Sequence, residues 1–319
     1  MTRTAVIALG GNALTREGEA GTYHEQLANA EAMARSIDSV LRDGWRVVVV
    51  HGNGPQVGNL AIQAEQASDL VPAQPLFSLD AMTQGQLGSM ISLALMEECG
   101  DHTEGVVSVV THVLVRSDDA GFLKPSKPIG PFFDAQRAEA LAGDGRVMVE
   151  DAGRGYRQVV ASPKPVAVVE ANAIRALVDG GYLVVACGGG GVPVARTERG
   201  FEGVEAVIDK DYSAQRLATT IGAEALVLVT GVAAVALDFG KPEQRTAHVL
   251  TAAEASRHLF AGQFPPGSMG PKVDASIRFL DDGGTVSIIT TPELILGALS
   301  GQEAVGTRII ARRTTREAR

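Results

Sequence analysis

Short apolar runs along the chain alternate with stretches in which apolar residues return every three or four positions. Residues 4–9 form a mostly apolar run that predicts a buried strand, and residues 23–43 carry an apolar stripe that predicts an amphipathic helix ending at Gly44. Strands and helices that alternate in this way predict an α/β fold around a mainly parallel sheet. Further strands are predicted at residues 46–50, 106–110, 182–186, 225–229 and 285–290, and helices at residues 56–69, 79–99, 169–179, 211–221, 252–260 and 271–280.

The stretch from about residue 112 to residue 165 interrupts this alternation. It is rich in proline, glycine and charge, and it contains only short β-like runs. Such a segment inside an α/β fold is typical of a surface insertion, so we predict a small protruding subdomain there. At the other end of the chain, the basic residues 313–319 predict a solvated tail.

Composition limits the kinds of partner. The 319 residues carry a formal net charge of -9, which disfavours a nucleic-acid surface because such surfaces need clustered lysine and arginine. Cys99 and Cys187 lack metal-ligand spacing, which favours a reducing, cytoplasmic compartment. The apolar runs are too short for a signal peptide or a membrane span, so we expect no membrane association.

Glycine clusters follow three of the predicted parallel strands, at residues 10–12, 52–54 and 188–191. In open α/β sheets, ligands bind beyond the carboxyl ends of the strands. Glycine allows backbone N–H groups to approach an anion, and the N-terminus of a following helix adds partial positive charge. Three such turns at one sheet edge predict a phosphate or carboxylate site.

Isolated lysines supply candidate cations for phosphoryl transfer. Lys210 lies just before the helix predicted to begin at Asp211, Lys272 lies at the start of another, and Lys127 lies in the predicted insertion. Phosphoryl transfer depends on positioning and on charge stabilisation, and lysine is a compact cation that reaches phosphate oxygens. An aspartate between two lysines would hold their ammonium groups apart. Each lysine alone is most simply a solvated surface charge, and His51 and Cys187 are interpreted as packing residues at strand ends.

Familiar nucleotide motifs do not account for this pattern. The chain has no P-loop sequence, and the turn at residues 52–54 lacks the third glycine of a dinucleotide fingerprint. The triplet Asp238-Phe239-Gly240 matches that of protein kinases, but no catalytic loop precedes it, so we interpret it as coincidence.

Several long segments together resemble the carbamate kinases of the amino-acid kinase superfamily, from about residue 4 to residue 310. They include ALGGNAL (8–14), HGNGPQVGNL (51–60), KPIGPF (127–132), EDAGRG (150–155), CGGGGVPV (187–194), GVEAVIDKD (203–211) and PGSMGPK (266–272). The resemblance implies a three-layer α/β/α sandwich in a single domain, with an acceptor-binding lobe at residues 1–180 and a nucleotide-binding lobe at residues 181–312. It also implies a homodimer that uses Mg²⁺ with ATP or ADP to interconvert carbamate and carbamoyl phosphate. Arginine, agmatine and purine-derived ureido catabolism would all suit the family.

The resemblance also implies roles for individual residues. Lys127, Lys210 and Lys272 would be cations at the transferring phosphoryl group, and Asp211 the carboxylate that organises them. Superfamily relatives place a lysine before the first two glycines; here Ala8 and Leu9 stand there, so Lys127 would replace it. Carbamate or carbamoyl phosphate would be held by Gly10, Gly11, Asn12, Gly52, Asn53 and Gly54. The nucleotide would be held by Lys210, Thr230, Gly231, Val232, Met269 and Lys272.

One segment departs from the family pattern. After Val232 the family usually has aspartate and a bulky or polar residue, whereas this chain has Ala233 and Ala234, which bears on nucleotide affinity. Two alternatives therefore stay open beside a carbamate kinase. One is a weak or silent relative that binds carbamoyl phosphate or nucleotide. The other is a different acyl-phosphate kinase of the superfamily, against which the short acceptor turns and the insertion with Lys127 count.

Overall fold

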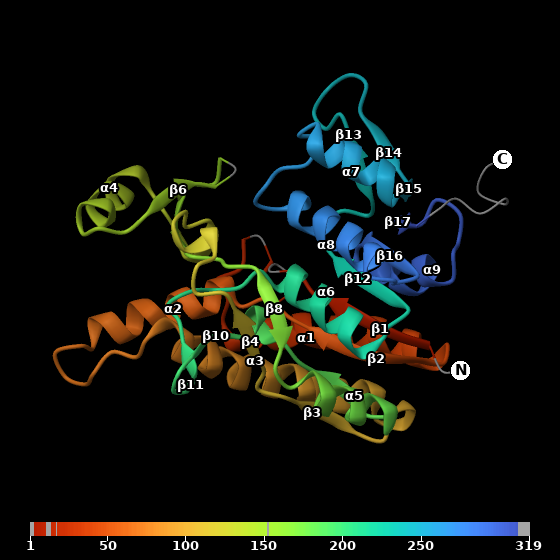
Figure 1. The fold of residues 1–319 in the computed structure, drawn as a ribbon, viewed down its shortest axis with the longest axis horizontal. Helices are drawn as coiled ribbons and strands as arrows, with labels where there is room; N and C mark the ends of the chain where they lie inside the picture. The colour runs from red at the N-terminus through yellow and green to blue at the C-terminus, as the bar shows by residue number, and fades with distance from the viewer. Residues whose placement is uncertain (1–2, 11–13, 17, 152, 312–319) are drawn as a thin grey trace.

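The computed structural model describes residues 3–10, 14–16, 18–151 and 153–311. An eight-stranded sheet lies at its centre, in the order β15-β17-β16-β12-β1-β2-β9-β3 (Figure 1). Every neighbouring pair is parallel except β16 and β17, which confirms the mainly parallel sheet. The strands are β1 (Arg3–Ala8), β2 (Trp45–Val50), β3 (Val106–Ser108), β9 (Leu183–Val185), β12 (Ala225–Val229), β15 (Val249–Thr251), β16 (Val286–Thr290) and β17 (Thr307–Ile310).

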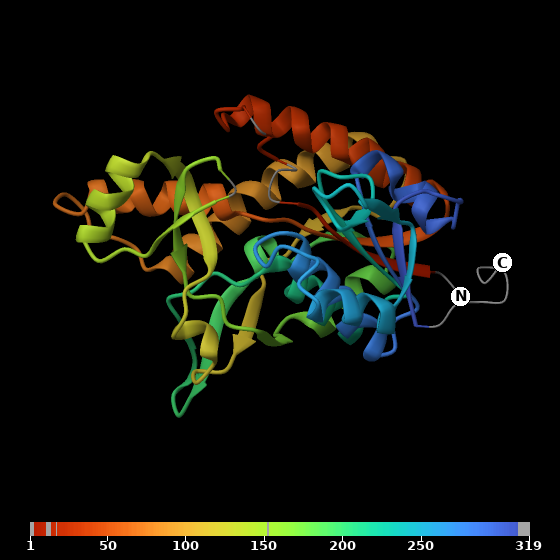
Figure 2. The same ribbon diagram turned by 90° about the horizontal axis from the view of Figure 1, so that it is seen from above.

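Helices cover both faces of this sheet, which gives the three layers seen in Figure 2. Along β1, Ala5 and Ile7 pack with α1, α3 and α9, whereas Val6 and Ala8 pack on the other face with α5, α6, α7 and α8. Because both faces are buried, the strands are continuous apolar runs. The predicted α/β/α sandwich is confirmed. The helices are α1 (Tyr23–Arg42), α2 (Gly54–Gln66), α3 (Leu76–Cys99), α4 (Ala135–Gly143), α5 (Ala171–Asp179), α6 (Lys210–Ile221), α7 (Ala252–Phe260), α8 (Met269–Asp281) and α9 (Ile295–Leu299).

The predicted helices are present, with ends that shift by at most about three residues, as helix ends do between assignments. The start of α1 is fixed by a capping box, in which the Thr22 side chain accepts from the Glu25 N–H and the Glu25 carboxylate accepts from the Thr22 N–H. The strand predicted at residues 182–186 ends early, at Val185. The chain turns there because Cys187 has a left-handed backbone, with φ of 50°.

Part of the segment predicted as an insertion protrudes from the sandwich. It forms a three-stranded sheet in the order β5-β7-β6 with α4 beside it, away from the central sheet in Figure 1. The two ends of the segment, β4 and β8, instead pair with each other in a second sheet of order β11-β10-β4-β8. These strands are β4 (His112–Val115), β5 (Lys127–Phe133), β6 (Met148–Glu150), β7 (Tyr156–Val160), β8 (Pro165–Val168), β10 (Val192–Thr197) and β11 (Gly200–Gly203).

The protruding sheet meets the body through a contact between two glycines. A Cβ atom placed on Gly58 of α2 would lie 2.0 Å from the backbone nitrogen of Gly130 in β5. No side chain fits at Gly58, so the backbones of α2 and β5 touch directly. Gly130 itself has φ of 71°, a conformation that glycine adopts without strain.

A short antiparallel hairpin follows β12 along the chain. Its strands are β13 (Val235–Leu237) and β14 (Arg245–Ala247), which pair antiparallel. Within the described ranges, no helix combines the length and the hydropathy needed to cross a bilayer.

Candidate active site

The predicted glycine turns meet at one edge of the central sheet, where β1, β2 and β9 end side by side. Backbone hydrogen bonds join them directly. The Leu9 N–H donates to the Val50 carbonyl at 2.7 Å, and the Gly189 N–H donates to the His51 carbonyl at 2.8 Å. The sequence therefore predicted correctly which turns converge.

Gly10 is the described residue of the first turn, and Gly11 and Asn12 lie outside the described residues. A Cβ atom on Gly10 would lie 3.0 Å from the Val229 carbonyl oxygen and 3.8 Å from Thr230 Cα. Gly10 is thus packed against the end of β12. This contact places the predicted acceptor side next to the predicted nucleotide side.

The second and third turns pack together without room for a side chain. A Cβ atom on Gly188 would lie 2.4 Å from His51 Nε2, and one on Gly189 would lie 2.2 Å from Asn53 Nδ2. His51 is buried, and its Nδ1 lies 3.0 Å from the Gly52 carbonyl. Burial lowers the pKa of His51 to about 4, so the ring is neutral at pH 7. A neutral buried ring fits the predicted packing role.

A group of five charged side chains lies at the same edge of the sheet and is called the lysine–aspartate cluster below. Lys210 Nζ donates to Asp211 Oδ1 at 3.1 Å, and Lys272 Nζ donates to Asp211 Oδ2 at 2.9 Å. Lys127 Nζ donates to Asp209 Oδ2 at 2.8 Å. Asp211 thus separates the ammonium groups of Lys210 and Lys272, in the arrangement that the sequence predicted.

Local structure explains why these side chains meet. Asp209 is the N-cap of α6, and its Oδ1 accepts from the Asp211 N–H at 3.0 Å, which leaves Oδ2 for Lys127. Lys272 lies in the first turn of α8, which packs beside α6. Lys210, Asp211 and Lys272 are buried, whereas Lys127 reaches in from β5 and stays partly exposed.

The cluster holds its charges because each is paired. Burial works to raise the pKa of Asp211 and of Asp209, but the neighbouring lysines outweigh burial and lower both pKa values. Burial also works against charge on Lys210, yet its two aspartates leave its pKa raised. For Lys272 burial prevails and the pKa is lowered. Because three lysines pair with two carboxylates, the cluster carries a net positive charge, which favours the binding of a further anion.

Asp209 is the member that sequence reasoning missed. The signal was available, because Asp209 lies two residues before the predicted helix start and aspartate is a favoured N-cap. Its position also allows a second partner, and Lys127 lies 82 residues away in the chain, so the pairing has no local signature. Asp209 therefore connects the protruding sheet to the start of α6.

The predicted nucleotide-side residues lie along the same edge. Thr230, Gly231 and Val232 directly follow β12, and Val232 is exposed. Met269 begins α8, three residues before Lys272. The acceptor turns, the cluster and the loop after β12 thus surround one region at the carboxyl ends of the strands, where ligands bind in open α/β sheets.

The loop after β12 is held by its backbone at Ala233, where the family resemblance led us to expect aspartate. The Thr290 hydroxyl donates to the Ala233 carbonyl at 3.2 Å. Any residue at position 233 can offer this carbonyl. Alanine at this position therefore keeps this anchor of the loop.

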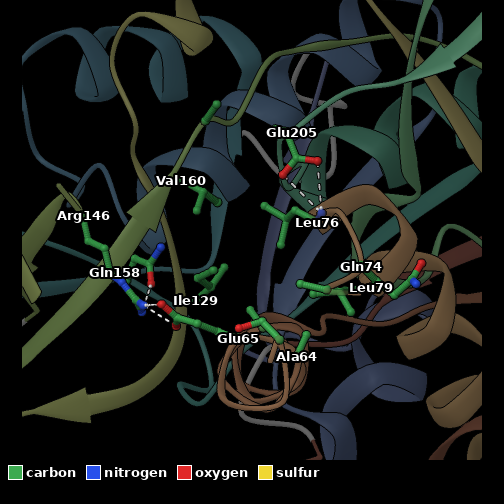
Figure 3. Close-up of a pocket in the computed structure, with 14 residues that line it drawn as sticks. Ala64, Glu65, Gln74, Leu76, Leu79, Ile129, Arg146, Gln158, Val160 and Glu205 are labelled. Atoms are coloured by element: carbon green, nitrogen blue, oxygen red, sulfur yellow. Dashed lines mark hydrogen bonds and ion pairs between the residues drawn. The ribbon is translucent and has the colours of Figure 1, made fainter. Parts of the chain in front are cut away.

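A separate pocket of about 520 Å³ lies between α2, the start of α3 and the protruding sheet (Figure 3). Arg146 pairs with Glu65 across it, and the Glu205 carboxylate accepts from the Leu76 N–H at 3.2 Å. The glycine turns and the lysine–aspartate cluster do not line this pocket. The candidate active site is therefore the polar sheet edge and not this cavity.

Comparisons with known proteins agree with the architecture. The family model described as the amino acid kinase family matches residues 3–291. A carbamate kinase of Thermococcus kodakarensis is 43% identical over 314 residues, which covers 97% of this chain and 99% of the relative. A carbamate kinase-like protein of Escherichia coli is 45% identical over 316 residues, covering 97% and 99%. The solved structure of a carbamate kinase from Giardia lamblia bound to AMP-PNP is 40% identical, with a TM-score of 0.86 and coverage of 97% and 98%.

Proposed function

Because this chain belongs to the amino acid kinase family and matches its carbamate kinases over nearly its full length, we propose that it transfers a phosphoryl group between ATP and carbamate. The reversible reaction forms ADP and carbamoyl phosphate. The observation that carries the proposal is the buried Lys210–Asp211–Lys272 arrangement beside the convergent glycine turns. The matches do not favour a silent relative or another acyl-phosphate kinase.

The transfer is direct. One P–O bond forms between the phosphorus and the incoming oxygen while the bond to the leaving oxygen breaks, and no covalent enzyme intermediate is involved. Lys210 and Lys272 stabilise the charge on the non-bridging oxygens, and Asp211 keeps the two ammonium groups apart. Lys127 adds a cation from the protruding sheet on the acceptor side.

Backbone groups hold the acceptor. N–H groups of Gly10, Gly11, Asn12 and of the turn at residues 52–54 bind the carbamate or carbamoyl-phosphate end. Glycine at these turns permits the close approach that an anion requires. The nucleotide lies on the other side of the cluster, along Thr230, Gly231, Val232 and Met269. The AMP-PNP bound to the Giardia relative supports ATP as the phosphoryl donor.

Mg²⁺ accompanies the nucleotide in this proposal. Among the described residues, no group of three or more His, Cys, Asp and Glu side chains could hold a metal ion. Asp209 and Asp211, the carboxylates nearest the transfer region, are each bound by lysine. Because lysines occupy both carboxylates, we propose that phosphate oxygens of the nucleotide hold the metal. When bound, Mg²⁺ neutralises phosphate charge.

Purified protein given MgADP and carbamoyl phosphate should form ATP, which luciferase detects directly. A reaction without ADP controls for contaminating nucleotide, and excess EDTA should stop ATP formation because the metal enters with ADP. Absence of ATP from the folded wild-type protein across a wide range of ADP concentrations would refute the proposed function.

We also propose that two copies associate. The exposed side chains of Met82, Leu93 and Met96 lie on one face of α3, because positions 11 and 14 residues apart fall on the same side of a helix. Apolar stripes of this kind mark association surfaces. Light scattering should give twice the 33.2 kDa of one chain, and a monomer at micromolar concentration would contradict the proposal.

The proposed cellular setting is the cytoplasm, in arginine breakdown. Cys99 and Cys187 are buried free thiols, as suits a reducing compartment. Fractionation of cells and the functions of neighbouring genes would test this setting, and a gene neighbourhood without enzymes of arginine use would count against the pathway.

A further inference from the structure

The side chain of Asn53, in the second glycine turn, is held by two residues of α3. Asn53 Nδ2 donates to Asp80 Oδ1 and to Thr83 Oγ1, each at 2.8 Å. Asn53 is 2% exposed, Asp80 1% and Thr83 0%. We propose that this turn binds the acceptor. The Asn53 side chain thus joins the turn to α3.

These contacts fix the orientation of the Asn53 amide. The Thr83 hydroxyl donates its single hydrogen to the Asp80 carbonyl at 2.7 Å, so towards Asn53 it can act only as an acceptor. The amide atom at that position must therefore be the NH₂ group. Both of its hydrogens are engaged, one by Thr83 and one by Asp80. Asn53 Oδ1 is left as an acceptor, and no described residue donates to it.

Asp80 contributes little else to the fold. Its Oδ2 is buried and has no hydrogen-bond partner among the described residues. Burial raises the pKa of the Asp80 carboxyl well above its usual value, and the Asn53 bond only partly opposes this. Oδ1 accepts from Asn53 whether or not Oδ2 carries a proton. A buried carboxyl with an unsatisfied oxygen destabilises a protein. We therefore attribute the role of Asp80 to its hydrogen bond with Asn53.

The free acceptor belongs to the second glycine turn, whose residues 52–54 bind the acceptor in the proposed function. The Asn53 amide packs against Gly189, where a Cβ atom would lie 2.7 Å from Oδ1. Backbone N–H groups of the glycine turns suit the carboxylate or phosphate oxygens of the substrate. They cannot accept hydrogen bonds from its amino group, which needs an oxygen such as Oδ1.

Building on the proposed function, we propose that Asp80 and Thr83 are positioning residues that lock the Asn53 amide so that its Oδ1 accepts from the amino group of carbamate or carbamoyl phosphate. This contact distinguishes carbamoyl phosphate from acetyl phosphate, which has nearly the same shape but carries a methyl group in place of the amino group. Residues of α3, which lie outside the glycine turns, thereby determine the selectivity for carbamoyl phosphate over acetyl phosphate.

The test compares the two acyl phosphates as phosphoryl donors to MgADP. The ratio of kcat/KM for carbamoyl phosphate to that for acetyl phosphate is measured in wild type, Asp80→Leu and Thr83→Val. Asp80→Asn and Thr83→Ser are matched controls, since each keeps an oxygen that can accept from Asn53. We expect Asp80→Leu to lower the ratio about tenfold, the effect of one hydrogen bond of ordinary strength, and both controls to stay near the wild-type ratio.

The outcomes separate this inference from the proposed function. A wild type that uses neither acyl phosphate contradicts the function itself. A wild-type ratio near one, or an equal fall for both acyl phosphates in Asp80→Leu and Thr83→Val, overturns the positioning role. If Asp80→Leu does not fold, Thr83→Val decides, because valine has nearly the shape of threonine and lacks only its hydroxyl group.

Discussion

Replacing Lys272 by alanine is expected to lower kcat for ATP formation by about 10²- to 10³-fold and to leave KM for ADP nearly unchanged. Lys272 Nζ is buried and held 2.9 Å from Asp211 Oδ2, so its charge is in place before the reaction. A preorganised cation aimed at charge that develops in the transition state contributes on this scale. Steady-state kinetics with carbamoyl phosphate and varied MgADP would measure both constants.

Lys124→Ala is the matched control for Lys272→Ala. Lys124 is an exposed lysine, outside the lysine–aspartate cluster. It should retain wild-type kcat, which would show that the loss at Lys272 does not reflect a general change in positive charge. A Lys272→Ala enzyme with wild-type kcat and a raised KM for ADP would mean that Lys272 binds the nucleotide equally in ground and transition states.

Asp211→Asn is expected to lower the free energy of unfolding by about 3–5 kcal/mol, because it leaves two buried ammonium groups without their shared carboxylate. Urea denaturation at pH 7 would measure the change. Burial works to raise the pKa of Asp211, but Lys210 and Lys272 lower it below the ordinary value of 3.8. The stabilisation is therefore complete above pH 3.8 and is lost only as the pH falls further, through the folded-state pKa.

The control for this stability effect is Asp118→Asn. Asp118 pairs with Arg116 at the surface, where both side chains are more than half exposed. An exposed ion pair is screened by water and contributes little to stability, so this variant should unfold near the wild-type urea concentration. If Asp211→Asn were no less stable than Asp118→Asn, the cluster would not be a buried ion network in solution.

Much of the sheet edge could be predicted from the sequence because its signals are local. Apolar runs marked β1, β2 and β9, and the glycines that follow each run marked their carboxyl ends. Parallel pairing then brings those ends together. Lys210 and Asp211 stood out as charged residues where a helix was predicted to begin, and Lys272 as a charged residue at the start of another. Lys210, Asp211 and Lys272 meet because α6 and α8 pack side by side on the same face of the sheet.

The residues that sequence reasoning missed are recognisable only through tertiary contacts. Asp80 and Thr83 lie on α3, where a polar residue near a helix start is ordinary and signals no function. Their importance comes from Asn53, which is 27 and 30 residues away. Three-residue strands such as β13 and β14 were also missed, because so short a run has no measurable periodicity.

The contact between Gly58 and Gly130 bears on how variants of this protein should be interpreted. Gly58 has no functional group, yet any substitution there would push β5 away from α2. That displacement would carry Lys127, three residues before Gly130, away from Asp209. In a mutational scan scored by activity, Gly58 would therefore resemble a chemically essential residue. A compensating change in β5 could restore activity to a variant whose only defect is this spacing. It could not restore activity to a variant that lacks a catalytic group.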